Sequence, residues 1–475
     1  MGLVVENSIS NENEARTVLV QFVSPDGTTF GSAMEVPTLT SCADLQDLVA
    51  QIERDIKDKS DASTSVADSP LSFAIVSEDG ATELSEVSLD LATALSGLKL
   101  SGEKTLRIRY HPMAQFRIRP VTRCSASMDG HTGPILCAAF SPDSSMLATG
   151  SGDATIRVWD ILTGLPGPIL GGHSGWILAV AWSSCGKYLL SACKDSSVKV
   201  WTRLDQDKPS SFVLKGHTKP VTCAVWEPYG TRVCTGGMDS SIKIWQGTNG
   251  HCLMTLSSHT APVMQVRWSS VSGRIYSGSR DRTVKVWSPD EGRHLCDLKG
   301  HGHWINTLAL NSDAIARANK NKEECVAMLN AVGGEKVLSG SDDMTMILWN
   351  KEKVLARMTG HQKPVNCAVF SPDGRYIASG SFDKSVRLWS AITGQYIAAF
   401  RGHVGDVYLV SWSIDSRMLV SASKDSTLKV WDCQTRKLKE DLPGHADEVF
   451  AVDWSPDGSA VASGGRDKVV KLWKH

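Results

Sequence analysis

The stretch GHTGPILCAAFSPDSSMLATGSGDATIRVWD, residues 130–160, decides the fold because its pattern returns along most of the chain. It opens on Gly-His, places an Asp 22 residues after the His, and places a Trp six residues after that Asp. Successive units begin about 42 residues apart, and a fixed period of this size indicates an array of equal structural units. The repeating histidines are His131, His173, His217, His259, His301, His361, His403 and His445.

A hydroxyl residue repeats as well, four positions before each Asp. In the first unit the repeated set is His131, Thr149, Asp153 and Trp159, and in the eighth it is His445, Ser463, Asp467 and Trp473. Ser, His and Asp also build hydrolase triads, but eight equal copies indicate a scaffold rather than one catalytic centre. Alternating polarity between the repeated residues predicts strands in each unit, in the first over Ile135–Phe140, Met146–Gly150 and Thr155–Trp159.

These residues resemble the WD40 family over roughly residues 115–475. The resemblance implies a closed β-propeller of four-stranded blades, in which the His, hydroxyl, Asp and Trp of each blade form one hydrogen-bonded chain. The eighth unit ends two residues after Trp473, so it lacks an outer strand. Phe116–Ser125 alternates suitably to supply that strand, which would close the ring and remove an exposed sheet edge. We therefore expect eight blades.

Two of the 15 tryptophans, Trp176 and Trp304, have no place in the repeated core. Each lies three residues after a repeating His, a point that WD40-like geometry puts near the central channel, where partners usually bind. They are candidate binding anchors, or else partly buried packing residues. A basic residue precedes four of the repeating Asp. These four residues form either a positive surface, which could bind RNA phosphates or acidic protein segments, or an ordinary solvated rim. These four residues are Lys194, Arg280, Lys424 and Arg466.

The fifth unit contains 20 extra residues between Leu310 and Val337. Its residues 314–331 have the composition of a helix, and strand order places this insertion, at about residues 312–334, on the opposite face of the ring. An insertion in a regular array is often functional, although it can equally be a tolerated surface loop.

Charge divides the chain into two parts. The total of 50 Lys and Arg against 51 Asp and Glu gives a formal net charge of −1. Residues 1–112 hold 18 acidic and 8 basic residues, a balance of −10, whereas residues 113–475 carry +9. No apolar run reaches the roughly 18–20 residues of a membrane span. None of the 12 cysteines forms a C-x-x-C pair, so we expect a reducing compartment.

The acidic part has its own pattern. After a flexible N-terminus, residues 1–15, it reads as two strands, a helix, further strands and a last strand, with a Ser- and Asp-rich insertion at about residues 59–70. This order predicts an α+β ubiquitin-like (β-grasp) domain over residues 16–112, followed by the propeller over residues 113–475. The predicted elements are strands Thr17–Val23 and Thr28–Val36, helix Ala43–Lys57, strand Leu71–Val76, helix Leu89–Leu95 and strand Leu106–Tyr110.

The combination of parts is more specific than the repeats. An acidic ubiquitin-like head followed by eight blades resembles the Notchless family of large-ribosomal-subunit (60S) assembly factors. Three segments carry the resemblance: AQFRIRPVTR at residues 114–123, GHGHWINT at residues 300–307 before the insertion, and DLPGHADEV at residues 441–449. The resemblance covers essentially the whole chain.

The resemblance implies a non-enzymatic function. In that family the propeller sits on the pre-60S particle, among rRNA and other assembly factors, and the head docks on the metal-ion-dependent adhesion site of the AAA+ ATPase midasin. The segment SGEKTLRIRY, residues 101–110, places Glu103 at the family's docking position. A carboxylate there would complete the coordination of the partner's Mg²⁺. The resemblance further implies no cofactor of its own, no membrane, a monomer outside the particle, and the nucleolus and nucleoplasm.

Two other readings remain open. WD40 substrate receptors of cullin ubiquitin ligases commonly carry Trp-Asp-x-Arg after a blade, but here Trp159-Asp160 continues Ile161-Leu162. A regulator of Notch-type receptors, which the family's name suggests, has no sequence feature that tests it. No phosphate loop or nucleophile motif indicates an enzyme.

Overall fold

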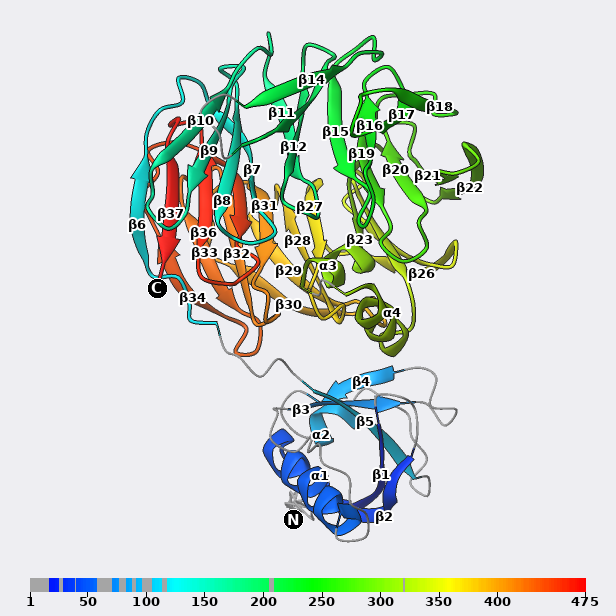
Figure 1. Cartoon of the computed structure of the whole chain (residues 1–475). Helices are drawn as coiled ribbons and strands as arrows, with labels where there is room; N and C mark the ends of the chain where they lie inside the picture. The colour runs from blue at the N-terminus through cyan, green and yellow to red at the C-terminus, as the bar shows by residue number, and fades with distance from the viewer. Residues whose placement is uncertain are drawn as a thin grey trace, which may run out of the picture. The chain divides into compact units, whose positions relative to one another are not determined.

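A computed structural model of the chain describes residues 17–24, 29–38, 40–57, 71–76, 83–87, 91–95, 105–112, 118–204, 209–318 and 321–475 (Figure 1). The chain divides into two compact units, residues 1–116 and 117–475. The expected boundary at residues 112–113 lies four residues before this division. The predicted flexible N-terminus 1–15, the 59–70 insertion and Glu103 lie outside the described residues.

The first unit is a five-stranded mixed sheet with the order β2-β1-β5-β3-β4. Its two central strands, β1 and β5, are parallel, and the other pairs are antiparallel. Strand β4 is a separate element that the sequence pattern did not predict. The elements are β1 Thr17–Val23, β2 Thr29–Pro37, α1 Cys42–Lys57, β3 Leu71–Val76, β4 Glu83–Val87, α2 Leu91–Leu95 and β5 Leu106–Pro112.

Helix α1 supplies much of the core of this unit. Its apolar positions recur every three or four residues, so Leu45, Val49 and Ile52 share one face and pack against Phe22 of β1 and Ile108 of β5. The helix begins at a reciprocal cap, in which the Ser41 amide donates to the Asp44 carboxylate at 3.1 Å.

The second unit contains eight four-stranded antiparallel sheets among the described residues. In each sheet the strands follow chain order from the inner to the outer edge, with one exception in the eighth. The first sheet consists of β7 Ile135–Phe140, β8 Met146–Ser151, β9 Ile156–Asp160 and β10 Pro166–Leu170. The second consists of β11 Ile177–Trp182, β12 Tyr188–Cys193, β13 Val198–Thr202 and β14 Ser210–Leu214. The third consists of β15 Val221–Trp226, β16 Arg232–Gly237, β17 Ser241–Gln246 and β18 Cys252–Ser257.

The later sheets continue the same order. The fourth consists of β19 Val263–Trp268, β20 Ile275–Ser279, β21 Thr283–Ser288 and β22 Arg293–Lys299. The fifth consists of β23 Ile305–Leu310, β24 Lys336–Ser341, β25 Met346–Asn350 and β26 Lys353–Met358. The sixth consists of β27 Val365–Phe370, β28 Tyr376–Ser381, β29 Ser385–Ser390 and β30 Tyr396–Arg401. The seventh consists of β31 Val407–Trp412, β32 Met418–Ser423, β33 Leu428–Asp432 and β34 Lys437–Leu442.

The eighth sheet joins the two ends of the second unit and closes the ring. It consists of β35 Val449–Trp454, β36 Val461–Gly465, β37 Val470–Lys474 and, from before the first sheet, β6 Arg123–Met128. Figure 1 shows β37, in red, beside β6, in cyan. The inner strands of neighbouring sheets lie side by side, and β35 lies beside β7, so the sheets form the blades of a closed propeller.

The closing strand lies further along the chain than expected. The predicted strand Phe116–Ser125 is wrong in its bounds, because the strand runs over Arg123–Met128. Pro120 has no amide hydrogen to donate, and the Ile118 amide is engaged by the Asp415 carboxylate at 3.1 Å. Regular pairing with β37 therefore starts only after these residues.

Tryptophans fill the space within and between blades. Trp159 and its seven equivalents six residues after the Asp are at most 3% exposed. The aromatic residue nine positions after the His also joins neighbouring blades, since the Trp182 and Trp226 indoles donate to the Ala139 and Ala181 carbonyls of the preceding blade at 2.9 and 3.1 Å. Trp182 is partly exposed, although the repeat pattern had placed it in the core.

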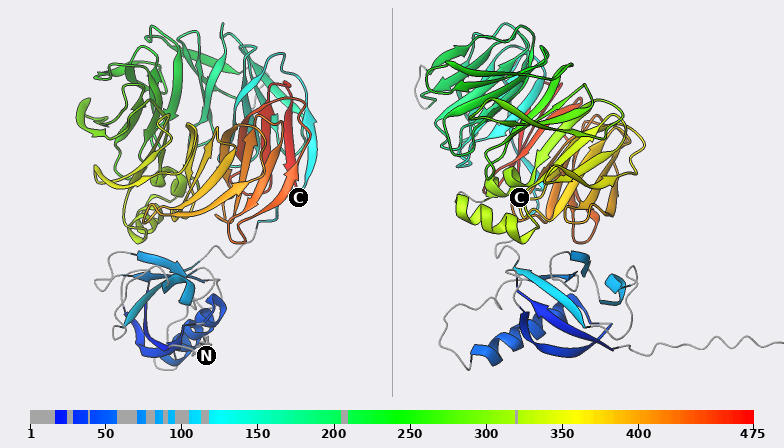
Figure 2. Two further views of the ribbon diagram at one scale, coloured as in Figure 1. Left: turned by 180° about the vertical axis from the view of Figure 1, so that it is seen from behind. Right: turned by 90° about the vertical axis from the view of Figure 1, so that its right-hand side faces the viewer.

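The insertion in the fifth blade forms two short helices rather than one. The predicted helical stretch 314–331 is helical but not continuous, because α3 covers Asn311–Ala318 and α4 covers Lys322–Ala331. Asn321 caps α4 by accepting the Glu323 amide at 3.1 Å, which starts a new helix at this point. Since Leu310 pairs with Val337, the insertion leaves the end of the blade opposite the His loop, as strand order implied. Figure 2 shows both helices, in yellow-green, against the ring.

Helix α3 links the fifth blade to the eighth. The Arg317 guanidinium donates to the Asp453 carboxylate at 2.7 Å and to the Trp454 carbonyl at 2.5 Å. Asp453 also accepts the Phe140 amide of the first blade at 3.1 Å. The insertion is therefore tied to the eighth blade directly and to the first blade through Asp453.

We expect Arg317→Ala to lower the free energy of unfolding of the propeller by about 1 kcal/mol. The substitution removes two charge-assisted hydrogen bonds, but the Arg317 side chain is 43% exposed, so solvent already screens much of the interaction. Denaturant unfolding followed by tryptophan fluorescence measures the change. Lys322→Ala, at an exposed position of α4, is the matched control, and equal effects of the two substitutions would contradict the proposed link.

Candidate functional site

The four repeated polar residues of each blade form one connected chain of hydrogen bonds. In the first blade the Trp159 indole donates to the Thr149 hydroxyl at 2.8 Å, and that hydroxyl lies 3.0 Å from Nε2 of His131. Nδ1 of the same imidazole lies 2.9 Å from the Asp153 carboxylate. One arrangement satisfies every group: a neutral imidazole protonated on Nδ1, which donates to Asp153 and accepts the hydroxyl proton on Nε2.

The eighth blade has the same geometry, and so do the others. The Trp473 indole donates to the Ser463 hydroxyl at 2.8 Å, and His445 contacts Ser463 and Asp467 at 2.7 Å each. The hydroxyl residues of all eight blades are 0% exposed. A hydroxyl that is fully buried and already bonded on both sides cannot reach a substrate, so the repeated Ser, His and Asp hold the blades together.

The glycine before the His has a conformational reason in the first blade. Gly130 has φ +153°, and a Cβ atom there would lie 2.6 Å from Nη1 of Arg157. Arg157 stands two residues before Trp159 and comes close enough to His131 to lower its pKa further. The Arg157 side chain could move aside, so the positive φ is the reason that favours glycine at this position.

In the first three blades the tetrad lowers the pKa of both the His and the Asp. Burial lowers the pKa of His131, His173, His217 and His445, against the attraction of their aspartates. Burial opposes ionisation of Asp153 as well, but hydrogen bonds from Thr155, Thr132 and His131 hold its pKa well below the ordinary value. The first three blades thus keep a neutral His beside an ionised Asp at neutral pH.

We expect the propeller to lose stability in two steps as the pH falls. Below about pH 6.5 the unfolded chain binds protons on histidines that stay neutral in the folded state, and below about pH 4 it binds protons on the tetrad aspartates. Asp313 acts oppositely, because burial raises its pKa to about 7. The Asp313→Asn variant removes this opposing group, so the histidine step is measured in that variant. Thermal unfolding between pH 7.5 and 3 measures this, and a melting temperature that stays constant from pH 7.5 to 5 would contradict it.

The end of each blade that carries the His loop and the Asp turn is here called the His–Asp face. In the fifth blade Ile305 at the start of β23 pairs with Ser341 at the end of β24, so residues 301–304 and 342–345 share one end. Trp176 and Trp304 lie on this face, 48% and 41% exposed. They are not core residues.

Each of these two tryptophans carries a cation on its ring. Nζ of Lys194 lies 4.8 Å from the centroid of Trp176, within the second blade. Cζ of Arg280, in the fourth blade, lies 4.5 Å from the centroid of Trp304, in the fifth blade. The structure thus brings four of the six residues predicted to bind partners together as two aromatic–cation pairs.

The other two predicted cations lie apart from these pairs. Lys424 is exposed in the turn of the seventh blade and makes no described hydrogen bond, ion pair or ring contact through its side chain. Arg466 in the eighth blade lies 3.6 Å from the Asp447 carboxylate and 4.0 Å from that of Glu448. Its charge is therefore partly compensated within the protein.

The repeat pattern missed an aromatic row on the same face. The rings of Phe382 and Tyr408 lie 6.1 Å apart, and those of Tyr408 and Phe450 lie 5.4 Å apart. The Tyr408 hydroxyl donates to the Glu448 carboxylate at 3.1 Å. A comparison of the residues five positions after each His would have found Tyr408 and Phe450, because the other blades have aliphatic or small polar residues there.

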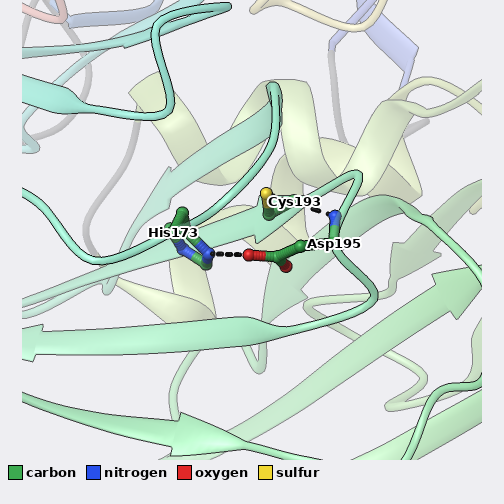
Figure 3. A group of neighbouring side chains, drawn as sticks. All are labelled: His173, Cys193 and Asp195. Carbon is green, nitrogen blue, oxygen red and sulfur yellow. Dashed lines mark hydrogen bonds and ion pairs between the residues drawn. The ribbon is translucent and has the colours of Figure 1, made fainter.

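His173, Cys193 and Asp195 form a cluster with donor atoms within 4.8 Å of one another, which could hold a metal ion (Figure 3). His173 lies 3.2 Å from Asp195, and the Asp195 amide donates to the Cys193 sulfur at 3.4 Å. Ser151 makes the same contact with the Asp153 amide in the first blade. Burial raises the pKa of Cys193 to about 11, so it is a protonated thiol at the position that Ser151, outside the tetrad, occupies in the first blade.

The repeats of the second unit match a known protein family. The family model for the WD domain, G-beta repeat, matches seven stretches: residues 122–160, 165–202, 208–246, 250–288, 352–390, 394–432 and 436–474. Between the fourth and fifth of these stretches lies the blade with the insertion. Among solved structures, the computationally designed Ika8 protein is similar, with a TM-score of 0.61 and 30% identity over 74% of this chain and 98% of that one.

Relatives extend the match beyond the repeats. The Notchless protein homolog of Arabidopsis thaliana is 44% identical over 415 residues, which cover 83% of this chain and 84% of that protein. Ribosome assembly protein 4 of Saccharomyces cerevisiae is 40% identical over 421 residues, 81% of this chain and 79% of that protein. The chain belongs to the Notchless and ribosome assembly protein 4 family.

A third member of this family, Protein Notchless of Drosophila melanogaster, is 41% identical over 325 residues, 63% of this chain and 65% of that protein. Among the helices that the structure describes, none combines the length and the hydropathy that a membrane span needs.

Proposed function

We propose that this protein is a non-catalytic assembly factor of the large ribosomal subunit. The observation that carries the proposal is the match of about four fifths of the chain to ribosome assembly protein 4, at 40% identity. The buried hydroxyls of the tetrads support a non-catalytic function, because they leave no Ser or Thr of the tetrads free to act as a nucleophile.

The propeller, in this proposal, binds the pre-60S particle through its His–Asp face. Trp176, Trp304, Lys194, Arg280, Lys424 and Arg466 are the proposed contact residues. The two exposed indoles support this choice, since large aromatic side chains left on a surface are typical anchors of interfaces. Because the protein would bind this particle, we expect it in the nucleolus and nucleoplasm.

The first unit, residues 1–116, is proposed to be a ubiquitin-like β-grasp domain that docks on midasin. The strand order β2-β1-β5-β3-β4, with a parallel central pair and α1 packed on the sheet, supports the fold. The proposed docking residue is Glu103, two residues before the described segment that leads into β5. Its carboxylate would bind the Mg²⁺ of the midasin adhesion site, so the metal belongs to the partner.

Affinity purification of the tagged full-length protein from cells tests the proposal. We expect precursor rRNA of the large subunit, other assembly factors and midasin in the eluate. Recovery of a cullin ligase or of receptor tails without ribosomal precursors would replace the proposed function with one of the two adaptor functions.

A further inference from the structure

The two aromatic–cation pairs of the His–Asp face contain cations whose charge no carboxylate of the described residues neutralises. Neither the Lys194 ammonium nor the Arg280 guanidinium makes an ion pair or hydrogen bond with a carboxylate in the part of the chain that the structure describes. Some other cations of the propeller do have such a partner, as Lys285 has in Asp297 at 2.6 Å.

Stacking on an indole orders each cation without neutralising it. The rings hold Lys194 and Arg280 at 4.8 and 4.5 Å, so both side chains lose less freedom when an anion binds. A guanidinium presents its donors as a planar fork that matches a carboxylate in two parallel hydrogen bonds. Each pair is therefore a ready receptor for an anionic group.

The surroundings favour separate carboxylates over a continuous polyphosphate. The residue after each cation is an ionised tetrad aspartate, Asp195 or Asp281, whose pKa stays below its ordinary value despite burial. Asp342 follows on the same face beside Trp304. Nucleic acid binds along an unbroken positive stripe, and these fixed negative charges interrupt one.

The surface between the pairs carries apolar side chains and one further cation. Lys194 belongs to the second blade and Arg280 to the fourth, so the turn of the third blade lies between them. There the position equivalent to these cations is Met238, whose amide donates to the carbonyl of Pro220. Both residues are partly exposed. Lys219, directly before Pro220, is exposed and adds a positive charge between the two pairs. A chain that crosses this region would contact three cations and the apolar side chains of Met238 and Pro220.

We infer that Trp176–Lys194 and Trp304–Arg280 form the two ends of a docking site for an extended acidic protein segment. Carboxylates of the segment bind Lys194 and Arg280, and its apolar residues cover the exposed indoles and Met238. This inference names the class of partner for the His–Asp face and so rests on the proposed function.

Fluorescence anisotropy with the full-length protein tests the inference. The probe is a fluorescein-labelled peptide of about sixteen residues, with three glutamates at each end and leucine, serine and glycine between them. We expect the combined variant Lys194→Glu, Arg280→Glu to weaken binding at least about tenfold. Replacing the glutamates of the peptide by glutamine has a similar effect.

The combined variant Lys437→Glu, Lys439→Glu is the matched control, because both lysines are exposed on β34, the outer strand of the seventh blade, and it changes the net charge by the same amount. We expect it to change affinity less than about twofold. A single-stranded oligouridine of equal length should not compete. An acidic peptide that does not bind at about 200 μM, equal effects of both charge reversals, or oligouridine binding that the double variant abolishes would overturn the inference.

A different result would contradict the proposed function. If the wild-type protein does not recover large-subunit precursors, the ribosomal assignment is wrong, whatever the peptide does. If those precursors are recovered but the peptide results are negative, the function stands and only the class of partner is wrong.

Discussion

Glu103→Gln is expected to abolish Mg²⁺-dependent binding to the adhesion domain of midasin while leaving the fold intact. An amide has nearly the shape of a carboxylate but no negative charge, and Mg²⁺ binds proteins chiefly through charged oxygen ligands. We expect the affinity to fall by at least about a hundredfold. Calorimetric titration of the isolated adhesion domain with the full-length protein, in Mg²⁺ and then in EDTA, measures the loss.

The control for this substitution is Glu35→Gln. Glu35 is exposed on β2, so its substitution removes the same unit of charge from the acidic unit at another position. If both variants lose affinity equally, the head binds through its overall charge, and Glu103 is not a metal ligand. If the Glu103→Gln variant binds with unchanged affinity, Glu103 is not the residue that binds the Mg²⁺ of midasin.

Thr149→Val is expected to lower the free energy of unfolding of the propeller by about 3–5 kcal/mol. Valine has nearly the same shape, so the cost comes from polar groups and not from a cavity. The Trp159 indole loses its acceptor at 2.8 Å, and Nε2 of His131 loses its donor at 3.0 Å, both in a place without water access. Each stranded buried group costs roughly 1–3 kcal/mol.

Thr132→Val is the comparison, since Thr132 is exposed one residue after the His and only its backbone amide contacts Asp153. We expect a change within about 0.5 kcal/mol there. Urea unfolding of the two variants, followed by tryptophan fluorescence, gives both values. A small effect of Thr149→Val would mean that the tetrad adds little to the rigidity of the blade.

The blades could be predicted from the sequence because one pattern is repeated with fixed spacing. Strand bounds in the first blade, Ile135–Phe140 and Met146–Ser151, agree with the alternation of polar and apolar residues to within one residue. The insertion is not repeated, so nothing in the array indicated the helix boundary that Asn321 creates by capping α4. The closing strand was misplaced because alternation also continues through Pro120, which cannot pair.

Individual residues of the candidate site could be predicted from the sequence, but the contacts between them could not. The register alone singled out Trp176 and Trp304, because their positions fall outside the repeated core. That Arg280 stacks on Trp304 depends on the packing of two different blades, which no single repeat unit contains. The compensation of Arg466 by Asp447 similarly depends on side-chain geometry.

The central claim is a division of labour, in which the propeller holds the pre-60S particle and the acidic unit couples the protein to midasin. Gradient sedimentation of cell extracts containing tagged wild-type protein or the Glu103→Gln variant tests this claim most directly. The account predicts that the variant stays with large-subunit precursors and accumulates there, because it binds the particle but cannot be released. A variant that sediments as free protein, or that distributes as the wild type does, would contradict the account.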